Sequence, residues 1–184
     1  MKRVYLIRHA QPAFPQGSKM CIGITDIPLG NEGREQAWQM AQSLPEVTAV
    51  FSSPLRRAIQ TAQAIGLPVT VLSGLREMYM GEWDGLTFAQ IRQRYPELYA
   101  TRGLDKTIPM PGQEDQEAAT VRFCADMENA AAQAPGDFAV VAHGGIIAKF
   151  LEKITGSWYK PGYAEVICLL WKDGRFYTKD QMTP

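Results

Sequence analysis

Short apolar segments alternate along this chain with longer amphipathic segments whose apolar residues recur at helical spacing. The short segments are continuous apolar runs, a pattern typical of strands buried on both faces of a parallel sheet. Strands are predicted at residues 4–7, 47–51, 69–72, 138–142, 164–171 and 176–177, and helices at 32–44, 54–65, 87–95, 114–134 and 146–154. This alternation predicts an α/β fold, a three-layer α/β/α sandwich with a mostly parallel central sheet.

The size and composition of the chain predict one domain. Its 184 residues can bury a substantial core without disulfides or metals, and 46% hydrophobic with 21% charged residues is an ordinary globular balance. Between residues 73 and 112 the pattern is irregular, and it ends in an exposed connection at 105–112 that contains two prolines. We therefore predict a single domain over residues 1–184, with about 73–112 as an insertion that covers the site.

Charge and cysteine content narrow the functional class. The 19 basic and 19 acidic side chains cancel, so no overall field favours nucleic acid or an anionic membrane as a partner. The first apolar run stops at Arg8, which is too short for a signal peptide or a spanning helix. The three cysteines are widely spaced and form no CxxC pair, which argues against a disulfide framework or a zinc site. These features predict a cytoplasmic protein and leave its oligomeric state open.

The carboxyl end of the first predicted strand carries Arg8 and His9. Open α/β sheets bind ligands at the carboxyl ends of their strands, so this dipeptide lies where a site is expected. The arginine is a permanent cation whose planar donor group suits phosphate, and the histidine can act as nucleophile or base. The alternative is a solvated polar pair at a strand end, and the rest of the chain decides between the two.

The second of only two histidines, His143, also follows a strongly apolar strand pattern. Two histidines at strand ends could ligate a metal, but the sequence contains neither an HExxH helix nor a clustered third carboxylate ligand. We therefore predict a site with no metal and no cofactor. Gly144 and Gly145 follow, and they allow the backbone of this strand-to-helix turn to approach an anion at the helix N-terminus.

A further strand-to-helix turn places arginines close to a predicted helix start. Ser53 is the expected N-cap and Pro54 the first helical residue, with Arg56 and Arg57 in the first turn. A cation there is unfavourable for the helix dipole, and a bound phosphate would offset that cost. We expect one arginine to face the site and the other to face solvent. Because the chain has no Walker A or GxGxxG pattern, a nucleotide-binding loop is not supported.

Five elements in the same order resemble the histidine phosphatase (phosphoglycerate mutase-like) superfamily, over nearly the whole chain. The first is an Arg-His-Gly-like motif at 8–10, with alanine in the glycine place, and the second is a Gly-x-x-Asp-x-Pro-Leu element at 23–29, followed by Gly-x-x-Gln-Ala at 33–37. The third is a Ser-Pro-Leu-x-Arg-Ala-x-Gln-Thr-Ala helix at 53–62. The fourth is a Leu-x-Glu loop with a downstream tryptophan motif at 75–85, and the fifth is His-Gly-Gly at 143–145. The resemblance implies the same α/β sandwich and phosphoryl-transfer chemistry.

The resemblance also implies a role for each matched residue. His9 would attack phosphorus and become a phosphohistidine, for which it must be neutral, and the cations nearby should favour that form. Arg8, Arg57 and His143 would hold the three equatorial phosphoryl oxygens, with Gly144 at the phosphate-binding turn. Glu77 would donate a proton to the leaving oxygen and then activate water.

Other residues are weaker candidates. Glu77 could instead be a surface carboxylate of its loop, but its position in the motif favours the catalytic role. Gln11, Ile22, Gly23 and Trp83 are candidate substrate-binding residues, although Gln11 could be a solvated loop side chain and Trp83 could pack in the core. Arg122, on the long helix after the insertion, is expected to pair with an acidic neighbour rather than with substrate.

Departures from the mutase pattern favour hydrolysis over transfer of the phosphoryl group back to the bound product, which a mutase requires. Pro15 replaces a polar asparagine, Ile22 replaces a threonine, Met80 replaces a tyrosine, and the long insertion with paired arginines is absent. We therefore predict a metal-independent phosphomonoesterase acting on a small phosphorylated metabolite. The loop at 21–29 is similar to that of bacterial members acting on α-ribazole 5′-phosphate. A phosphoglycerate mutase and a catalytically weak phospho-ligand binding module remain the alternatives.

Overall fold

One mixed sheet forms the centre of the protein. The computed structural model describes residues 1–15, 18–105, 107–178 and 181. Within these residues the sheet has the strand order β3-β2-β4-β1-β5-β6. Its strands are β1 (Lys2–Arg8), β2 (Ala49–Ser52), β3 (Val69–Val71), β4 (Phe138–Ala142), β5 (Val166–Lys172) and β6 (Arg175–Thr178). The four strands from β3 to β1 run parallel, whereas β5 is antiparallel to β1 and β6 is antiparallel to β5.

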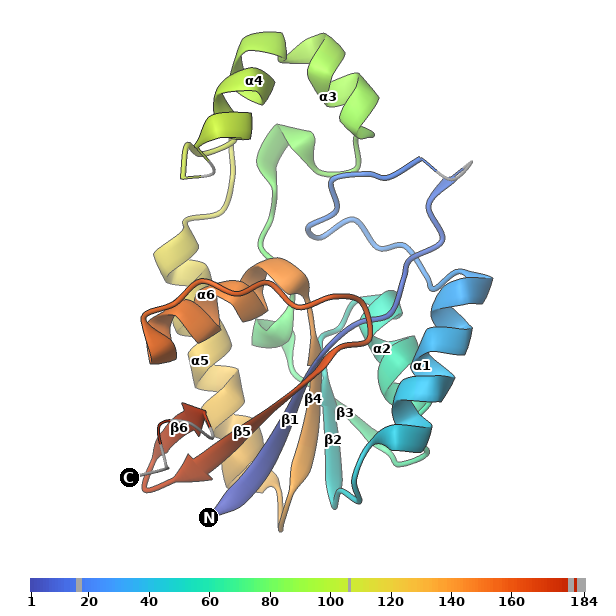
Figure 1. Ribbon diagram of the computed structural model, residues 1–184, viewed down its shortest axis with the longest axis vertical. Coiled ribbons are helices and arrows are strands. Elements are labelled where there is room, and N and C mark those ends of the chain that lie inside the picture. Colours follow the sequence, from blue (N-terminus) through green and yellow to red (C-terminus); the bar gives the residue numbers. More distant parts are fainter. Residues whose placement is uncertain (16–17, 106, 179–180, 182–184) are drawn as a thin grey trace.

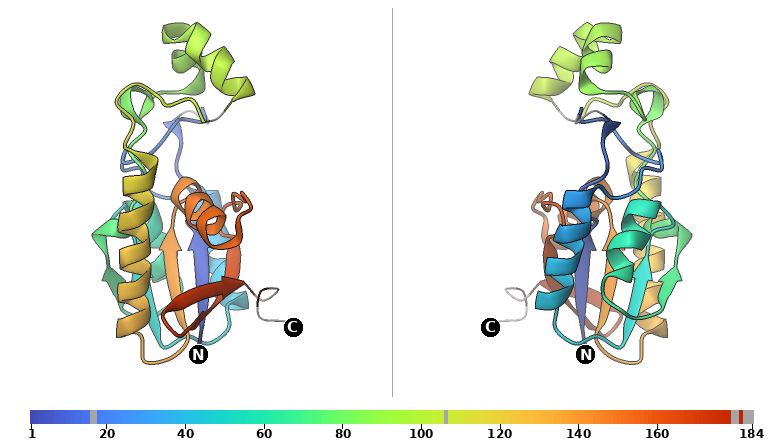
Figure 2. Two further views of the ribbon diagram at one scale, coloured as in Figure 1. Left: turned by 90° about the vertical axis from the view of Figure 1, so that its left-hand side faces the viewer. Right: turned by 90° about the vertical axis from the view of Figure 1, so that its right-hand side faces the viewer.

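Helices cover both faces of this sheet (Figures 1 and 2). Helices α1 (Asn31–Ser43) and α2 (Arg56–Gln63) pack on one face, and α5 (Gln116–Gln133) and α6 (Gly144–Thr155) pack on the other. The predicted three-layer α/β/α sandwich with a mostly parallel sheet is therefore confirmed.

Alternation along the strands explains why the apolar runs are continuous. In β1, Val4 and Leu6 pack against α5 and α6, while Tyr5 and Ile7 pack against α1 and α2. Every residue of β4 is buried, because this strand lies between β1 and β2 with helices above and below. A strand covered on both faces has no position for a solvated side chain, so the period-two pattern disappears.

The region 73–112 contains more helix than the sequence predicted. It holds two short 3-10 helices, η2 (Ser73–Leu75) and η3 (Gly81–Trp83), followed by α3 (Phe88–Arg94) and α4 (Pro96–Leu104). Helices α3 and α4 stand beyond the carboxyl ends of the parallel strands (Figure 1).

Two details of this region differ from the expectation. The sequence predicted no α4, yet Pro96 is its first residue, a position where proline needs no N–H partner. The connection at 105–112 is not wholly exposed, because Met110 is buried against Trp83 and Ile91 in a small core of the region. Pro96, which follows the end of α3, is thus also the first residue of α4.

The starts of two helices also differ from the prediction. Helix α2 begins at Arg56 with Leu55 as its N-cap, so Ser53 does not cap it as expected. Helix α6 begins at Gly144, two residues earlier than predicted, with His143 as its N-cap. Ser53 and His143 therefore lie in strand-to-helix turns at the carboxyl edge of the sheet.

No helix in the described part of the chain is long and apolar enough to cross a membrane.

Candidate active site

The two histidines meet because their strands are neighbours. Strands β1 and β4 pair in parallel with Arg8 opposite Ala142, so the next residues, His9 and His143, emerge side by side. The backbone N–H of His9 donates to the Ala142 carbonyl at 2.9 Å, and the ring centroids of the histidines lie 5.0 Å apart. The sheet thus brings together the two side chains that the sequence placed at separate strand ends.

His9 is oriented by a carbonyl group. Its Nδ1 lies 2.7 Å from the carbonyl oxygen of Ala10, which can only accept a hydrogen bond, so Nδ1 carries the proton and Nε2 keeps its lone pair. The side chain is 4% exposed. Burial, together with the positive charges of Arg57 and Arg8, holds the pKa of His9 well below 6.5. The ring is therefore neutral, with an unshared electron pair on Nε2. From the sequence, only the nearby cations were expected to keep the ring neutral, whereas burial is the larger cause of the lowered pKa.

Arg57 is the buried member of its pair. It is fully buried, while Arg56 is exposed, as the prediction of opposite orientations required. Nη1 of Arg57 donates to the Thr25 carbonyl and Nη2 to the Gly23 carbonyl, each at 2.7 Å. These two bonds fix the plane of the guanidinium.

Asp84, from the region 73–112, fixes the loop that holds Arg57. Its carboxylate accepts hydrogen bonds from the backbone N–H groups of Gly23, Ile24 and Thr25 at 2.8–3.2 Å and from the Thr25 hydroxyl. Gly23 has no room for a side chain, because a Cβ would lie 2.2 Å from the Met78 carbonyl oxygen and 2.5 Å from Asp84 Oδ2. A chain of contacts therefore runs from the region 73–112 to the buried arginine.

Arg8 is held from the other side by the loop that follows α6. Its Nη1 donates to the Pro161 carbonyl at 2.8 Å, and its guanidinium lies 4.0 Å from the ring centroid of Tyr163. A Cβ on Gly144 would lie 3.0 Å from Arg8 Nε and 3.0 Å from the Lys160 side chain. The glycine therefore allows two cations to approach the start of α6.

Glu77 lies at the same helix N-terminus. Its carboxylate accepts hydrogen bonds from the backbone N–H groups of Gly145 and Ile146, both at 2.8 Å, and from its neighbour Met78 at 3.0 Å. The side chain is 5% exposed, so Glu77 is not a surface loop carboxylate. A carboxylate is favourable at this helix end because it satisfies free N–H groups and faces the positive end of the dipole.

An ion-pair network holds the Glu77 loop in place. Arg122 donates to the backbone carbonyls of Gly74, Arg76 and Glu77 and pairs with Glu114, which confirms the expected acidic partner. Glu114 also pairs with Arg76. Burial alone would raise the pKa of Glu114, but hydrogen bonds from the two arginines outweigh it and bring the value to about 2.

Three buried nitrogen atoms around His9 have no hydrogen-bond partner in the described residues. They are Nε of Arg8, Nε of Arg57 and Nδ1 of His143, and the two comparable atoms elsewhere are on Trp83 and Arg102. Buried donors are rarely left unsatisfied in a folded protein. Two guanidinium groups and a neutral imidazole with free nitrogens can accommodate a tetrahedral oxyanion such as a phosphoryl group.

The weaker candidates make contacts with other parts of the protein. The Gln11 amide donates to Glu32 on α1 at 2.9 Å, so it serves that contact. Trp83 is buried in the small core of the region 73–112, where its ring packs near Tyr95 and Tyr99. Gly23 contributes its carbonyl to Arg57, and Ile22 is partly buried beside it.

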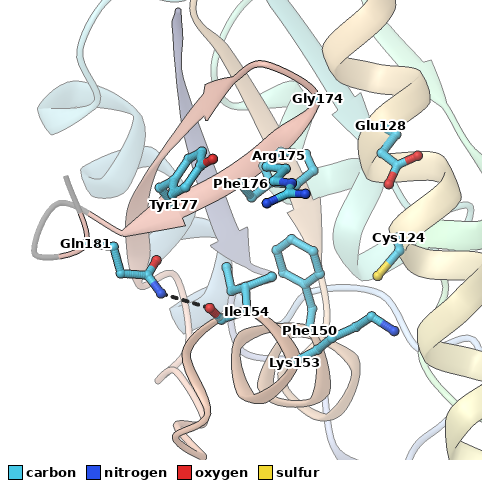
Figure 3. Close-up of a pocket in the computed structure, with 10 residues that line it drawn as sticks. All are labelled: Cys124, Glu128, Phe150, Lys153, Ile154, Gly174, Arg175, Phe176, Tyr177 and Gln181. Atoms are coloured by element: carbon cyan, nitrogen blue, oxygen red, sulfur yellow. Dashed lines mark hydrogen bonds between the residues drawn. The ribbon is translucent and has the colours of Figure 1, made fainter.

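One cavity lies away from these residues. It measures about 480 Å³ and opens between α5, α6 and the β5–β6 hairpin, where Cys124, Phe150 and Phe176 line it (Figure 3). Over the part of the chain with assigned structure, no three histidine, cysteine, aspartate or glutamate side chains gather as metal ligands. The three cysteines are free.

Comparison with known proteins identifies the family. The family model of the histidine phosphatase superfamily (branch 1) matches residues 4–179. Glucosyl-3-phosphoglycerate phosphatase of Mycobacterium tuberculosis is 34% identical over 162 residues, which cover 80% of this chain and 72% of that protein. A solved structure of the mycobacterial glucosyl-3-phosphoglycerate phosphatase with VO3 has a TM-score of 0.80 and 30% identity, and covers 92% of this chain and 93% of that one.

The α-ribazole phosphatase of Shigella flexneri has a TM-score of 0.79 over 96% of this chain and 94% of that chain, at 21% identity, which supports the fold alone. The chain belongs to the histidine phosphatase superfamily, branch 1. It is a phosphoric monoester hydrolase of that superfamily, as the sequence motifs implied.

Proposed function

We propose that the protein hydrolyses a small phosphorylated metabolite through a phosphohistidine on His9, without a metal ion. The observation that carries this proposal is the set of free buried nitrogens on Arg8, Arg57 and His143, grouped around a neutral histidine whose Nε2 retains its lone pair. A phosphoryl group placed among these nitrogens would satisfy all of them and face the nucleophile.

The reaction proceeds in two displacements. In the first, the lone pair of His9 Nε2 forms a bond to phosphorus while the bond to the leaving oxygen breaks, and Glu77, which enters this step protonated beside the bound phosphate dianion, gives that oxygen its proton. In the second, Glu77 takes a proton from water, the water oxygen bonds to phosphorus, and the N–P bond breaks to restore neutral His9. Arg8, Arg57 and His143 stabilise the equatorial oxygens in both steps, because charge accumulates there.

The substrate is a small monoester that reaches the site beneath the region 73–112. Glucosyl-3-phosphoglycerate is a candidate on the identity to the mycobacterial relative, and α-ribazole 5′-phosphate is one on the similarity of the loop at 21–29. We place the activity in the cytoplasm, which the free cysteines and the lack of CxxC pairs favour. A panel of phosphorylated metabolites that includes both candidates tests the substrate.

The test of the mechanism is hydrolysis of p-nitrophenyl phosphate with EDTA present. We expect chelator-resistant turnover in the wild type, none in His9→Ala, and acid-labile, base-stable phosphate on His9 after rapid quenching. Turnover without any such phosphate would refute the phosphohistidine. Tight phosphate binding without turnover would favour the binding module, and interconversion of 2- and 3-phosphoglycerate faster than their hydrolysis would favour the mutase.

A further inference from the structure

Ser53 is a buried serine whose hydroxyl faces the second histidine. It follows β2, next to β4, where its backbone N–H donates to the Val141 carbonyl at 3.0 Å. Its side chain is fully buried, and its Oγ lies 2.6 Å from Nε2 of His143. The sequence predicted this serine as a helix cap, but the helix begins at Arg56 and leaves the hydroxyl for another use.

The direction of this hydrogen bond follows from the other partners of the hydroxyl. Ser53 Oγ already accepts a hydrogen bond from the Leu55 N–H at 3.2 Å, and its own proton needs an acceptor. In the described residues the only acceptor within reach is Nε2 of His143. If Nε2 carried the proton instead, the buried hydroxyl hydrogen would have no partner. The serine therefore donates, and Nε2 accepts.

The other nitrogen of His143 leads to the same tautomer. Nδ1 is buried and has no partner in the described chain, so it is the nitrogen that remains for a ligand. Phosphoryl oxygens only accept hydrogen bonds, so a useful contact requires a proton on Nδ1. A neutral imidazole with its proton on Nε2 would instead direct a lone pair at the anion. The serine contact and the ligand contact require the same tautomer.

We propose that Ser53 is a positioning residue that holds His143 in the Nδ1–H tautomer, so that this histidine donates a hydrogen bond to the transferring phosphoryl group. This inference rests on the proposed function, and it adds a residue that does not touch the substrate. A donor to Nε2 also stabilises the neutral ring, because it must be lost when that nitrogen is protonated. Burial and the charge of Arg57 act in the same direction on the pKa of His143.

The tautomer can be measured without any activity assay. The chain has only two histidines, so a long-range ¹H–¹⁵N spectrum contains two imidazole patterns, and a His9→Gln variant assigns them. We expect the Nδ1–H pattern for His143 in the wild type and a shift towards Nε2–H or tautomer exchange in Ser53→Ala. An Nε2–H pattern in the wild type, or an unchanged pattern in Ser53→Ala, would overturn the proposal even if the enzyme is a phosphatase.

Kinetics give the second measurement. We expect kcat of Ser53→Ala for p-nitrophenyl phosphate to fall about tenfold to a hundredfold, less than the loss from removing a direct donor to the transition state. Ser52→Ala is the matched control, because Ser52 is equally buried and its hydroxyl donates to the Ser53 carbonyl rather than to a histidine. Unchanged kcat in Ser53→Ala, or an equal loss in Ser52→Ala, would contradict the assignment. Ser53→Thr retains the hydroxyl and should restore the wild-type tautomer.

Discussion

The Glu77 carboxylate occupies the space that a side chain on Gly145 would need. A Cβ built on Gly145 lies 2.9 Å from Glu77 Oε1 and 3.0 Å from Oε2, while the Gly145 N–H donates to Oε2 at 2.8 Å. The glycine at this position of the His-Gly-Gly turn therefore permits a carboxylate to bind the start of α6.

We predict that Gly145→Ala displaces the Glu77 carboxylate and lowers kcat at least tenfold, since a catalytic group shifted by a fraction of an ångström loses its productive geometry. Gly103→Ala in α4 is the control, because a Cβ there has no neighbour within 4 Å. The control should keep full activity and gain up to about 1 kcal/mol of helix stability. Full activity of Gly145→Ala would show that Glu77 is not held as described.

Arg56 and Arg57 provide a matched pair for testing the phosphate site. We expect Arg57→Ala to lower kcat/KM for p-nitrophenyl phosphate about a hundredfold to a thousandfold, because it removes a preorganised donor from a buried site. Arg56→Ala should change it little, since the side chain is exposed. The affinity for inorganic phosphate, measured by calorimetry, should follow the same order. A similar effect of both substitutions would contradict the assignment.

Asp84 should affect the reaction through Arg57. Asp84→Asn keeps the volume but loses acceptors for the N–H groups of residues 23–25, so the carbonyls that hold Arg57 become less fixed. We expect weaker phosphate binding and a lower kcat/KM, by about tenfold. Glu82→Gln is the control, since among the described residues its carboxylate accepts a side-chain hydrogen bond only from the exposed Tyr95 hydroxyl. If phosphate binding is unchanged in Asp84→Asn, the loop does not depend on this carboxylate.

The histidines should not titrate at their usual pH. Burial and the arginine charges lower the pKa of both His9 and His143 well below 6.5, so both rings stay neutral as the pH falls through that value. An NMR titration of their ring C–H signals from about pH 7.5 to about pH 5.5 should show no inflection near 6.5. An inflection there for His9 would mean that its environment is more solvated than the structure implies.

Glu114 should make stability depend on acidity. Its folded pKa of about 2 lies below the ordinary value of 4.5, so it stabilises the fold above 4.5 and loses that effect as the pH falls towards 2. In urea unfolding, Glu114→Gln should be less stable than the wild type at neutral pH, with the difference shrinking below pH 4.5. Glu97→Gln, at an exposed carboxylate, is the control. A difference that is constant with pH would contradict the network.

The sequence was most informative where residues lie at strand ends. The proximity of His9 and His143 followed from the general placement of sites in α/β sheets, and the choice of Arg57 followed from its motif. These inferences need only local patterns and a known sheet edge.

Contacts between distant segments could not be predicted in this way. Asp84 binds a loop about sixty residues earlier, and Ser53 contacts a histidine ninety residues later. Neither has a periodic or spacing signal, because each depends on how the layers pack. Helix α4 was missed for a local reason, since Pro96 is compatible both with the end of one helix and with the start of another.

The link between Asp84 and the loop at 23–25 limits how new specificities could be engineered on this scaffold. A chimaera that exchanges only residues 73–112 for the corresponding segment of a relative would remove the carboxylate that these backbone N–H groups require. The transplanted segment and the loop at 21–25 must therefore be exchanged together. Libraries that vary residues 21–25 and 73–112 jointly should yield more active variants than libraries that vary either segment alone.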